Sequence, residues 1–100
     1  MIPEVLKKSK QRIAEICRQY KIRELSLFGS QVRGDSTAKS DFDFLVDFEP
    51  EAEIDYFKYF EIQEELEKVV NKKVDLVPKD GLKPLIKKSV LSEAEIIYAA

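Results

Sequence analysis

Residues 22–48 read IRELSLFGSQVRGDSTAKSDFDFLVDF, and this stretch decides the fold class. Its first part, 22–28, is apolar towards its end and stops at Gly29, a pattern that predicts a strand running into a tight turn. Its last part, 42–48, is a second apolar run that predicts another strand. The sequence between them is small and polar, with one helical turn expected over 30–33. Two strands therefore flank one polar loop.

The segments outside this stretch follow mainly helical spacing. Residues 3–20 begin with Pro3, which suits a first helical turn, and carry one apolar stripe. Its members are Leu6, Ile13, Ile16, Cys17 and Tyr20. The remaining predicted elements are a helix over 53–71, a strand over 74–77, a helix over 84–91, and a tail over 94–98 that fits either a strand or a helix. This order predicts an α+β fold, a small mixed β-sheet with helices packed on it.

Composition limits the chemistry that the chain can perform. A length of 100 residues suits a single domain with one core, so we expect one domain over 1–100. The chain has no histidine, and Cys17 is its only cysteine. Histidine-based metal sites, intramolecular disulfides and Ser/His or Cys/His nucleophile pairs are therefore excluded. Because Cys17 lies in the apolar stripe, we interpret it as a small core residue.

Charge and hydropathy indicate the compartment and the kinds of partner. Seventeen basic residues against nineteen acidic ones give a net charge of -2, so no direct contact with nucleic acid is expected. No apolar run approaches the roughly 18–20 residues that span a bilayer. Residues 1–20 carry charge throughout, unlike the apolar core of a signal peptide. We therefore expect a cytoplasmic protein without a membrane partner.

Two carboxylates at the start of the second predicted strand are the strongest candidates for chemistry. Successive side chains of a strand alternate between its faces, so Asp41 and Asp43 project together while Phe42 and Phe44 face the other way. Neighbouring carboxylates repel each other unless a cation or hydrogen-bond donors compensate. Mg²⁺ prefers oxygen ligands and often takes one or two carboxylates together with substrate phosphates. The alternative is that Asp41 caps a turn and Asp43 is a solvated strand residue.

The Gly-Ser pair upstream favours the metal and phosphate interpretation. Gly29 allows the backbone to approach a ligand closely, and Ser30 offers a hydroxyl and an amide at the start of a helical turn. This arrangement suits a phosphate, although no Gly-Lys-Ser/Thr follows, so it is not a P-loop. Arg33 either contacts phosphate or lies on the surface. We interpret two further acids nearby, Asp35 and Asp47, as solvated residues that do not bind the metal.

These residues together resemble a known family. Leu27-Phe28-Gly29-Ser30, ten intervening residues and Asp41-Phe42-Asp43 are similar to the Gly-Ser-x10-Asp-x-Asp signature of the DNA polymerase beta-like nucleotidyltransferase superfamily. The chain most resembles its minimal nucleotidyltransferases, the MNT (MntA-like) antitoxins of HEPN/MNT toxin-antitoxin pairs. Val74-Asp75-Leu76-Val77 matches the strand on which the family places its last catalytic carboxylate. The resemblance spans roughly residues 3–98.

The resemblance implies roles for individual residues. Asp41, Asp43 and Asp75 would be the catalytic residues and would bind two Mg²⁺ ions, with Asp75 helping to deprotonate the attacking hydroxyl. Gly29 and Ser30 would hold the outer phosphates of the nucleotide, with Arg33 as a further contact. The implied reaction is attack of an acceptor hydroxyl on the α-phosphate of a nucleoside triphosphate, with pyrophosphate leaving.

The resemblance also implies a biological setting. We expect a magnesium-dependent antitoxin that transfers AMP from ATP, or from another nucleoside triphosphate, to a tyrosine hydroxyl of a HEPN-type toxin. The alternative is a non-catalytic antitoxin that neutralises its partner by binding. A tRNA or antibiotic nucleotidyltransferase is disfavoured, because the chain has no second domain for such an acceptor and no net basic charge to guide RNA.

Overall fold

The structure, a computed structural model, describes residues 2–34 and 41–100. Within these ranges the helices and strands alternate along the chain. The elements are α1 (Glu4–Lys8), α2 (Lys10–Gln19), β1 (Ile22–Phe28), α3 (Ser30–Arg33), β2 (Phe42–Phe48), α4 (Tyr56–Val70), β3 (Val74–Pro78), a 3-10 turn (Lys79–Gly81), α5 (Pro84–Glu93) and β4 (Glu95–Ala99). None of the helices in these ranges is long and apolar enough to cross a membrane.

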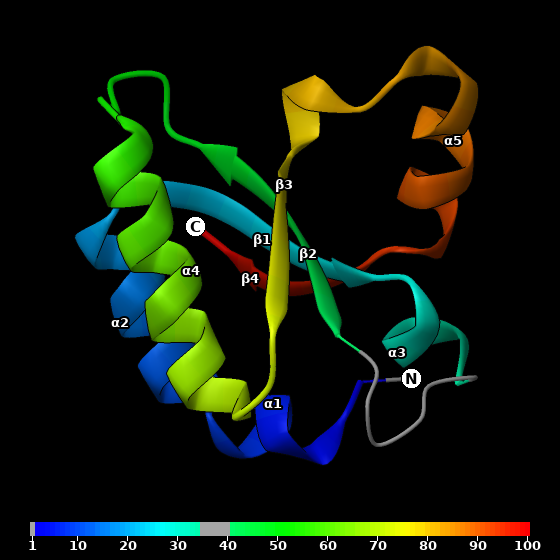
Figure 1. The fold of residues 1–100 in the computed structure, drawn as a ribbon, viewed down its shortest axis with the longest axis horizontal. Helices are drawn as coiled ribbons and strands as arrows, with labels where there is room; N and C mark the ends of the chain where they lie inside the picture. Colours follow the sequence, from blue (N-terminus) through cyan, green and yellow to red (C-terminus); the bar gives the residue numbers. More distant parts are fainter. Residues whose placement is uncertain (1, 35–40) are drawn as a thin grey trace.

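The strands form one mixed sheet in the order β3-β2-β1-β4 (Figure 1). β1 pairs antiparallel with both β2 and β4, whereas β2 and β3 run parallel. The parallel pair is possible because α4 lies between β2 and β3 in the chain. This helix returns the chain to the end of the sheet at which β2 begins, so that β3 can run in the same direction. The expected α+β class is confirmed.

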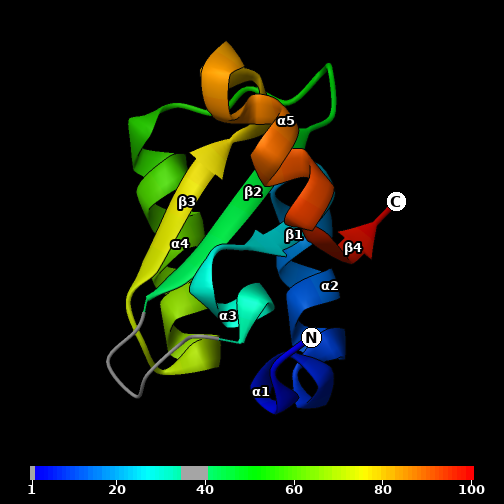
Figure 2. The ribbon, with the colours of Figure 1, turned by 90° about the vertical axis from the view of Figure 1, so that its right-hand side faces the viewer.

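The two faces of the sheet have different coverings. α1, α2 and α4 pack on one face, where they bury the core with Phe42, Phe44 and Val46 of β2. α3 and α5 lie on the other face, nearer the viewer in Figure 2. Because side chains alternate along a strand, Asp43 and Asp47 of β2 point away from the core and towards this second face. The site residues therefore lie on the less covered face of the sheet.

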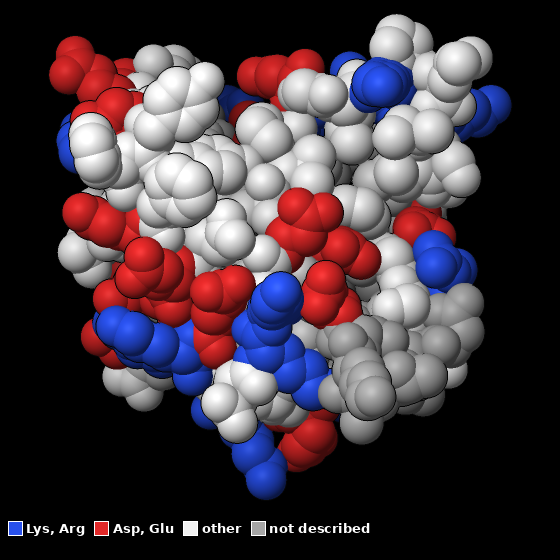
Figure 3. All heavy atoms as spheres, in the orientation of Figure 1, with Lys and Arg blue, Asp and Glu red and all other residues white. Residues whose placement is uncertain are grey.

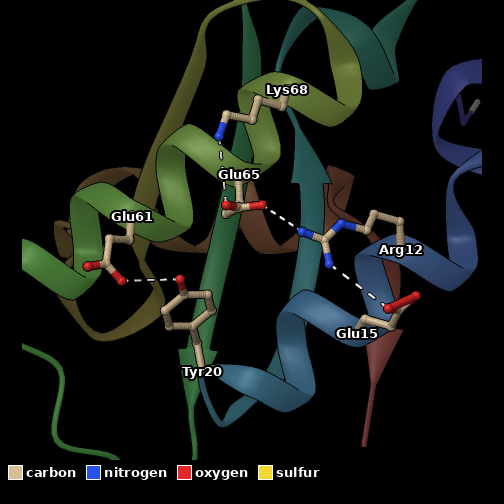
Figure 4. Close-up of polar contacts among 6 residues, drawn as sticks. All are labelled: Arg12, Glu15, Tyr20, Glu61, Glu65 and Lys68. Carbon is tan, nitrogen blue, oxygen red and sulfur yellow. Dashed lines mark hydrogen bonds and ion pairs between the residues drawn. The ribbon is translucent and has the colours of Figure 1, made fainter.

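An ion pair and a hydrogen bond join α2 and α4 beneath the sheet (Figure 4). Arg12 of α2 donates to Glu65 of α4 over 2.6 Å. Tyr20, at the end of α2, donates its hydroxyl to Glu61 over 3.2 Å. The predicted apolar stripe of α2 packs below these contacts, since Ile13 and Ile16 are at most 1% exposed. Tyr20 is only half-buried, because its polar end reaches this surface network.

One sequence-based expectation needs correction, and two points that the sequence leaves open are settled. The single helix expected over 3–20 is divided at Ser9, a weak helix former that ends α1 and precedes α2. The tail, which fits either a strand or a helix, forms β4 through its pairing with β1. The aromatic residues of α4 fit either core packing or a partner interface by sequence: Tyr59 is partly buried against the core, but three others are exposed. These are Tyr56, Phe57 and Phe60, at 85%, 80% and 60% exposure.

Candidate active site

The parallel pairing of β2 and β3 brings together two of the predicted carboxylates. Asp43 and Asp75 are register partners on adjacent strands, so their side chains leave the same face of the sheet. They are 32 positions apart in the chain. Asp41 directly precedes β2 and is exposed. In Figure 3, acidic side chains gather over β2 and β3 in the middle of this view, next to a group of basic side chains.

Electrostatics couple these carboxylates. The pKa of Asp43 is raised, first by burial of its carboxyl group and then by the negative charges of Asp75 and Asp41. Arg33 opposes this effect and lowers the pKa of Asp43. The ionised state of Asp43 is thus disfavoured by its surroundings unless a cation joins the group. The positive charge of a metal ion would favour this ionised state.

Gly29 allows β1 to end directly against Asp43. Its backbone has φ 81° and ψ -155°, a conformation that residues other than glycine rarely adopt. A Cβ at this position would overlap the Oδ2 atom of Asp43 and would lie 3.2 Å from its Cγ. Ser30 follows as the first residue of α3. The predicted Gly-Ser turn therefore lies beside the predicted metal ligand, and glycine is required for this contact.

A residue that the sequence did not single out, Glu93, occupies the donors of this turn. Its Oε1 atom accepts a hydrogen bond from the Gly29 amide over 3.0 Å and pairs with Nη1 of Arg33 over 3.3 Å. The Gly29 amide is thus engaged within the protein instead of being open to a phosphate. The negative charge of Glu93 also makes a small contribution to raising the pKa of Asp43.

One signal in the sequence could have drawn attention to Glu93. It is the last residue of α5, whose final turn contains no basic residue. A negative charge at a helix C-terminus is disfavoured by the helix dipole. A carboxylate in this position therefore needs a partner from elsewhere in the fold, which sequence periodicity alone does not reveal.

The site matches the ligand preference of magnesium without forming a closed metal cage. Asp41, Asp43 and Asp75 supply only carboxylate oxygens, which hard divalent cations prefer. Within residues 2–34 and 41–100, no group of three or more His, Cys, Asp or Glu side chains has the spacing of a metal site. Because Mg²⁺ commonly takes one or two carboxylates and completes its shell with substrate phosphates and water, these residues fit the ion.

Other residues considered from the sequence serve structural roles. Asp47 pairs with Arg23 over 2.6 Å across β1 and β2, as expected of a residue outside the metal site. Cys17 is fully buried, and this burial raises the pKa of its thiol to about 12, so it is a core residue as predicted. Asp35 lies outside the described residues.

Comparison with known proteins identifies relatives along most of the chain. A protein of Methanocaldococcus jannaschii, named as a candidate protein adenylyltransferase, is 41% identical over 98 residues, which cover 97% of this chain and 93% of that protein. The protein adenylyltransferase MntA of Thermococcus cleftensis is 42% identical over 84 residues, covering 84% of this chain and 81% of the relative.

Solved structures share the fold. A candidate minimal nucleotidyltransferase superposes with a TM-score of 0.78 at 29% identity, over 95% of each chain. A chain from a toxin-antitoxin crystal structure with AMP-PNP superposes with a TM-score of 0.72 at 22% identity, over 91% of this chain and 73% of the other. At that identity the second likeness concerns the fold alone.

The family model described as the nucleotidyltransferase domain matches residues 10–97, which include β1, the Gly-Ser turn and all three predicted carboxylates. The resemblance noted in the sequence is confirmed: the chain belongs to the nucleotidyltransferase domain family.

Proposed function

We propose that this protein is a magnesium-dependent nucleotidyltransferase and the antitoxin of a HEPN/MNT pair, which transfers AMP from ATP to a tyrosine hydroxyl of its partner toxin. The observation that carries the proposal is the placement of Asp43 beside Asp75 and against the Gly29-Ser30 turn. The adenylyltransferase names of the relatives support the reaction class. The toxin-antitoxin complexes among the structural neighbours support the kind of partner.

Each site residue has a proposed task in this reaction. Asp41, Asp43 and Asp75 hold two magnesium ions, while Ser30 and Arg33 orient the outer phosphates of the nucleotide. When bound, magnesium lowers the pKa of the acceptor hydroxyl and neutralises negative charge on the pyrophosphate leaving group. Gly29 contributes by having no side chain, which leaves room for the Asp43 carboxylate.

In the proposed transfer, Asp75 lies next to the acceptor hydroxyl. The tyrosine oxygen forms a bond to the α-phosphorus while the bond from that phosphorus to the bridging oxygen of pyrophosphate breaks. Asp75 accepts the proton of the tyrosine hydroxyl. β3 is an edge strand of the sheet, and Asp75 is exposed, so a side chain on another protein can reach this carboxylate.

Mass spectrometry tests the proposal directly. The purified chain is incubated with ATP, Mg²⁺ and the HEPN-type protein encoded by the neighbouring gene, and the partner is then examined for an adenylyl group on tyrosine. We expect the adduct with the native chain and its loss when Asp41→Asn and Asp43→Asn are combined. Asp47→Asn is the matched control on the same strand, because Asp47 pairs with Arg23.

Two results would contradict catalysis. One is the absence of any adduct with the native chain, and the other is an undiminished adduct with the double variant. If the double variant still forms the complex and still neutralises the toxin, neutralisation works by binding and the non-catalytic alternative is correct.

A further inference from the structure

We infer that Glu93 is a positioning residue for the nucleotide: by engaging the Gly29 amide and the Arg33 guanidinium, its carboxylate holds the turn that leads into Ser30, and the Arg33 side chain, in the arrangement that receives the triphosphate. This role rests on the proposed function, because it concerns how the same site binds its nucleotide. Glu93 comes from the junction of α5 and β4, far along the chain from the Gly-Ser turn.

The contacts of Glu93 converge on one oxygen atom. Oε1 accepts from the Gly29 amide over 3.0 Å and from the Arg33 guanidinium over 3.3 Å. The Glu93 side chain is 26% exposed, whereas that of Arg33 is 51% exposed. The more buried carboxylate thus anchors the more exposed cation. A hydrogen bond to a charged group is stronger than one between neutral groups, which favours a fixed geometry.

This anchoring affects the two sides of the candidate site. On the phosphate side, Glu93 fixes the amide of Gly29, whose peptide leads directly into Ser30. On the metal side, it holds the Arg33 charge where that charge lowers the pKa of Asp43. A single side chain therefore couples the orientation of the turn to the electrostatics of the metal ligand.

The charge of Glu93 alone would work against nucleotide binding. Glu93 is negative, lies close enough to Asp43 to raise the pKa of that residue, and would repel a triphosphate. Its benefit must come from the reach of the side chain and from the hydrogen bond that it accepts. Reach and charge can be separated experimentally, since glutamine keeps the length and an acceptor oxygen while aspartate keeps the charge and is shorter.

The test compares Glu93→Gln with Glu93→Asp in the full chain. Affinity for AMP-PNP with Mg²⁺ is measured by calorimetry at a temperature below the unfolding transition of every variant. We expect Glu93→Asp to weaken binding roughly tenfold, because the bond to Gly29 is lost, and Glu93→Gln to remain within about threefold of the native chain. A purely electrostatic effect of the carboxylate, which repels the triphosphate, would instead leave Glu93→Asp close to the native chain and make Glu93→Gln bind more tightly than the native chain.

Glu24 provides the matched control. It pairs with Lys79 over 3.3 Å with a side chain 29% exposed, and it lies about 17 Å from Gly29 along β1 at roughly 3.4 Å per residue. Glu24→Gln and Glu24→Asp should leave nucleotide affinity unchanged. Equal affinity for both Glu93 variants and the native chain, or a loss with Glu93→Gln as large as that with Glu93→Asp, would overturn the positioning role. If the native chain bound no nucleotide, the proposed function itself would fail, and this role with it.

Discussion

At the scale of single residues, Asp43 is placed for function at the expense of stability. Its raised pKa means that the folded state binds the Asp43 proton more tightly than the unfolded state. Protonated Asp43 therefore stabilises the folded state. This stabilisation is fully present below the pKa that Asp43 has in the unfolded chain, and it is lost as the pH rises through the higher pKa of the folded chain. At neutral pH the ionised Asp43 therefore destabilises the chain when no metal is bound.

We accordingly expect Asp43→Asn to raise the free energy of unfolding at pH 7 by about 1 kcal/mol in the presence of a chelator, while abolishing transfer activity. Urea unfolding at pH 7 and below pH 4 checks this, and the gain should shrink at the lower pH. Asp47→Asn should show no such gain, since it removes the pair with Arg23. Equal effects of the two substitutions on the free energy of unfolding would contradict the conclusion that ionised Asp43 destabilises the folded chain.

Two glycines allow the effect of an unusual backbone conformation to be distinguished from the effect of contact with the site. Gly29 and Gly34 both have positive φ, at 81° and 84°, but only Gly29 lies against Asp43. Each change to alanine should lower the free energy of unfolding by roughly 1–3 kcal/mol, because residues with a Cβ rarely adopt a positive φ. Gly29→Ala should also reduce the transfer rate by about 100-fold, because it displaces a metal ligand. Steady-state kinetics of the two variants measure this difference, and a similar loss of activity with Gly34→Ala would argue against it.

At the scale of elements, hydrogen bonds link α4 to the edge strand that carries Asp75, one of them from the Val74 amide to Glu67. Tyr59 donates its hydroxyl to the carbonyl oxygen of Leu76 over 2.6 Å. Tyr59→Phe keeps the ring and removes the hydroxyl, so we expect a loss of about 1 kcal/mol in the free energy of unfolding. Urea unfolding at neutral pH provides the measurement. An unchanged stability would mean that this hydrogen bond adds nothing to the other contacts of β3, which include its pairing with β2 and the bond from Val74 to Glu67.

Tyr59 also makes the stability of the folded chain depend on pH in the alkaline range. Burial, followed by the charge of Asp75, raises the pKa of Tyr59 from 10.0 to about 12. Its contribution to stability is therefore present below pH 10 and is lost as the pH rises from 10 to 12. The stability difference between the native chain and Tyr59→Phe should narrow over this range. Comparing the two chains removes the effects of other groups, such as Cys17, that titrate there as well.

At the scale of the whole molecule, the core and the exposed aromatic residues contribute unequally to folding. Phe44 is fully buried in the centre of the core, whereas Phe57 on α4 is 80% exposed. Phe44→Ala should lower the free energy of unfolding by roughly 3–5 kcal/mol, and Phe57→Ser should change it by less than about 0.5 kcal/mol. Thermal and urea unfolding distinguish these outcomes. A large loss with Phe57→Ser would show that this aromatic side chain packs within the fold.

Much of the fold was predictable because local rules decide it. Apolar runs that end at turn residues located β1 and β2, and the Gly-Ser and Asp-x-Asp pairs placed the turn and the first carboxylates beside them. The division of the first helix at Ser9 and the strand character of β4 were not predictable, because each depends on packing or pairing with distant residues. The sequence left the exposure of Phe57 and Phe60 open for the same reason: helical spacing shows which residues share a face, but not whether another element covers it.

The sequence by itself determined most of the elements, the family and the chemical types available to the site. It also determined which carboxylates share a face within β2, since the period of a strand is local. Only the tertiary structure decided that Asp75 lies beside Asp43, because parallel pairing joins strands separated by a whole helix. It alone placed the Glu93 carboxylate on the Gly29 amide, since a contact between residues 64 positions apart arises from the packing of α5 and β4 against the sheet.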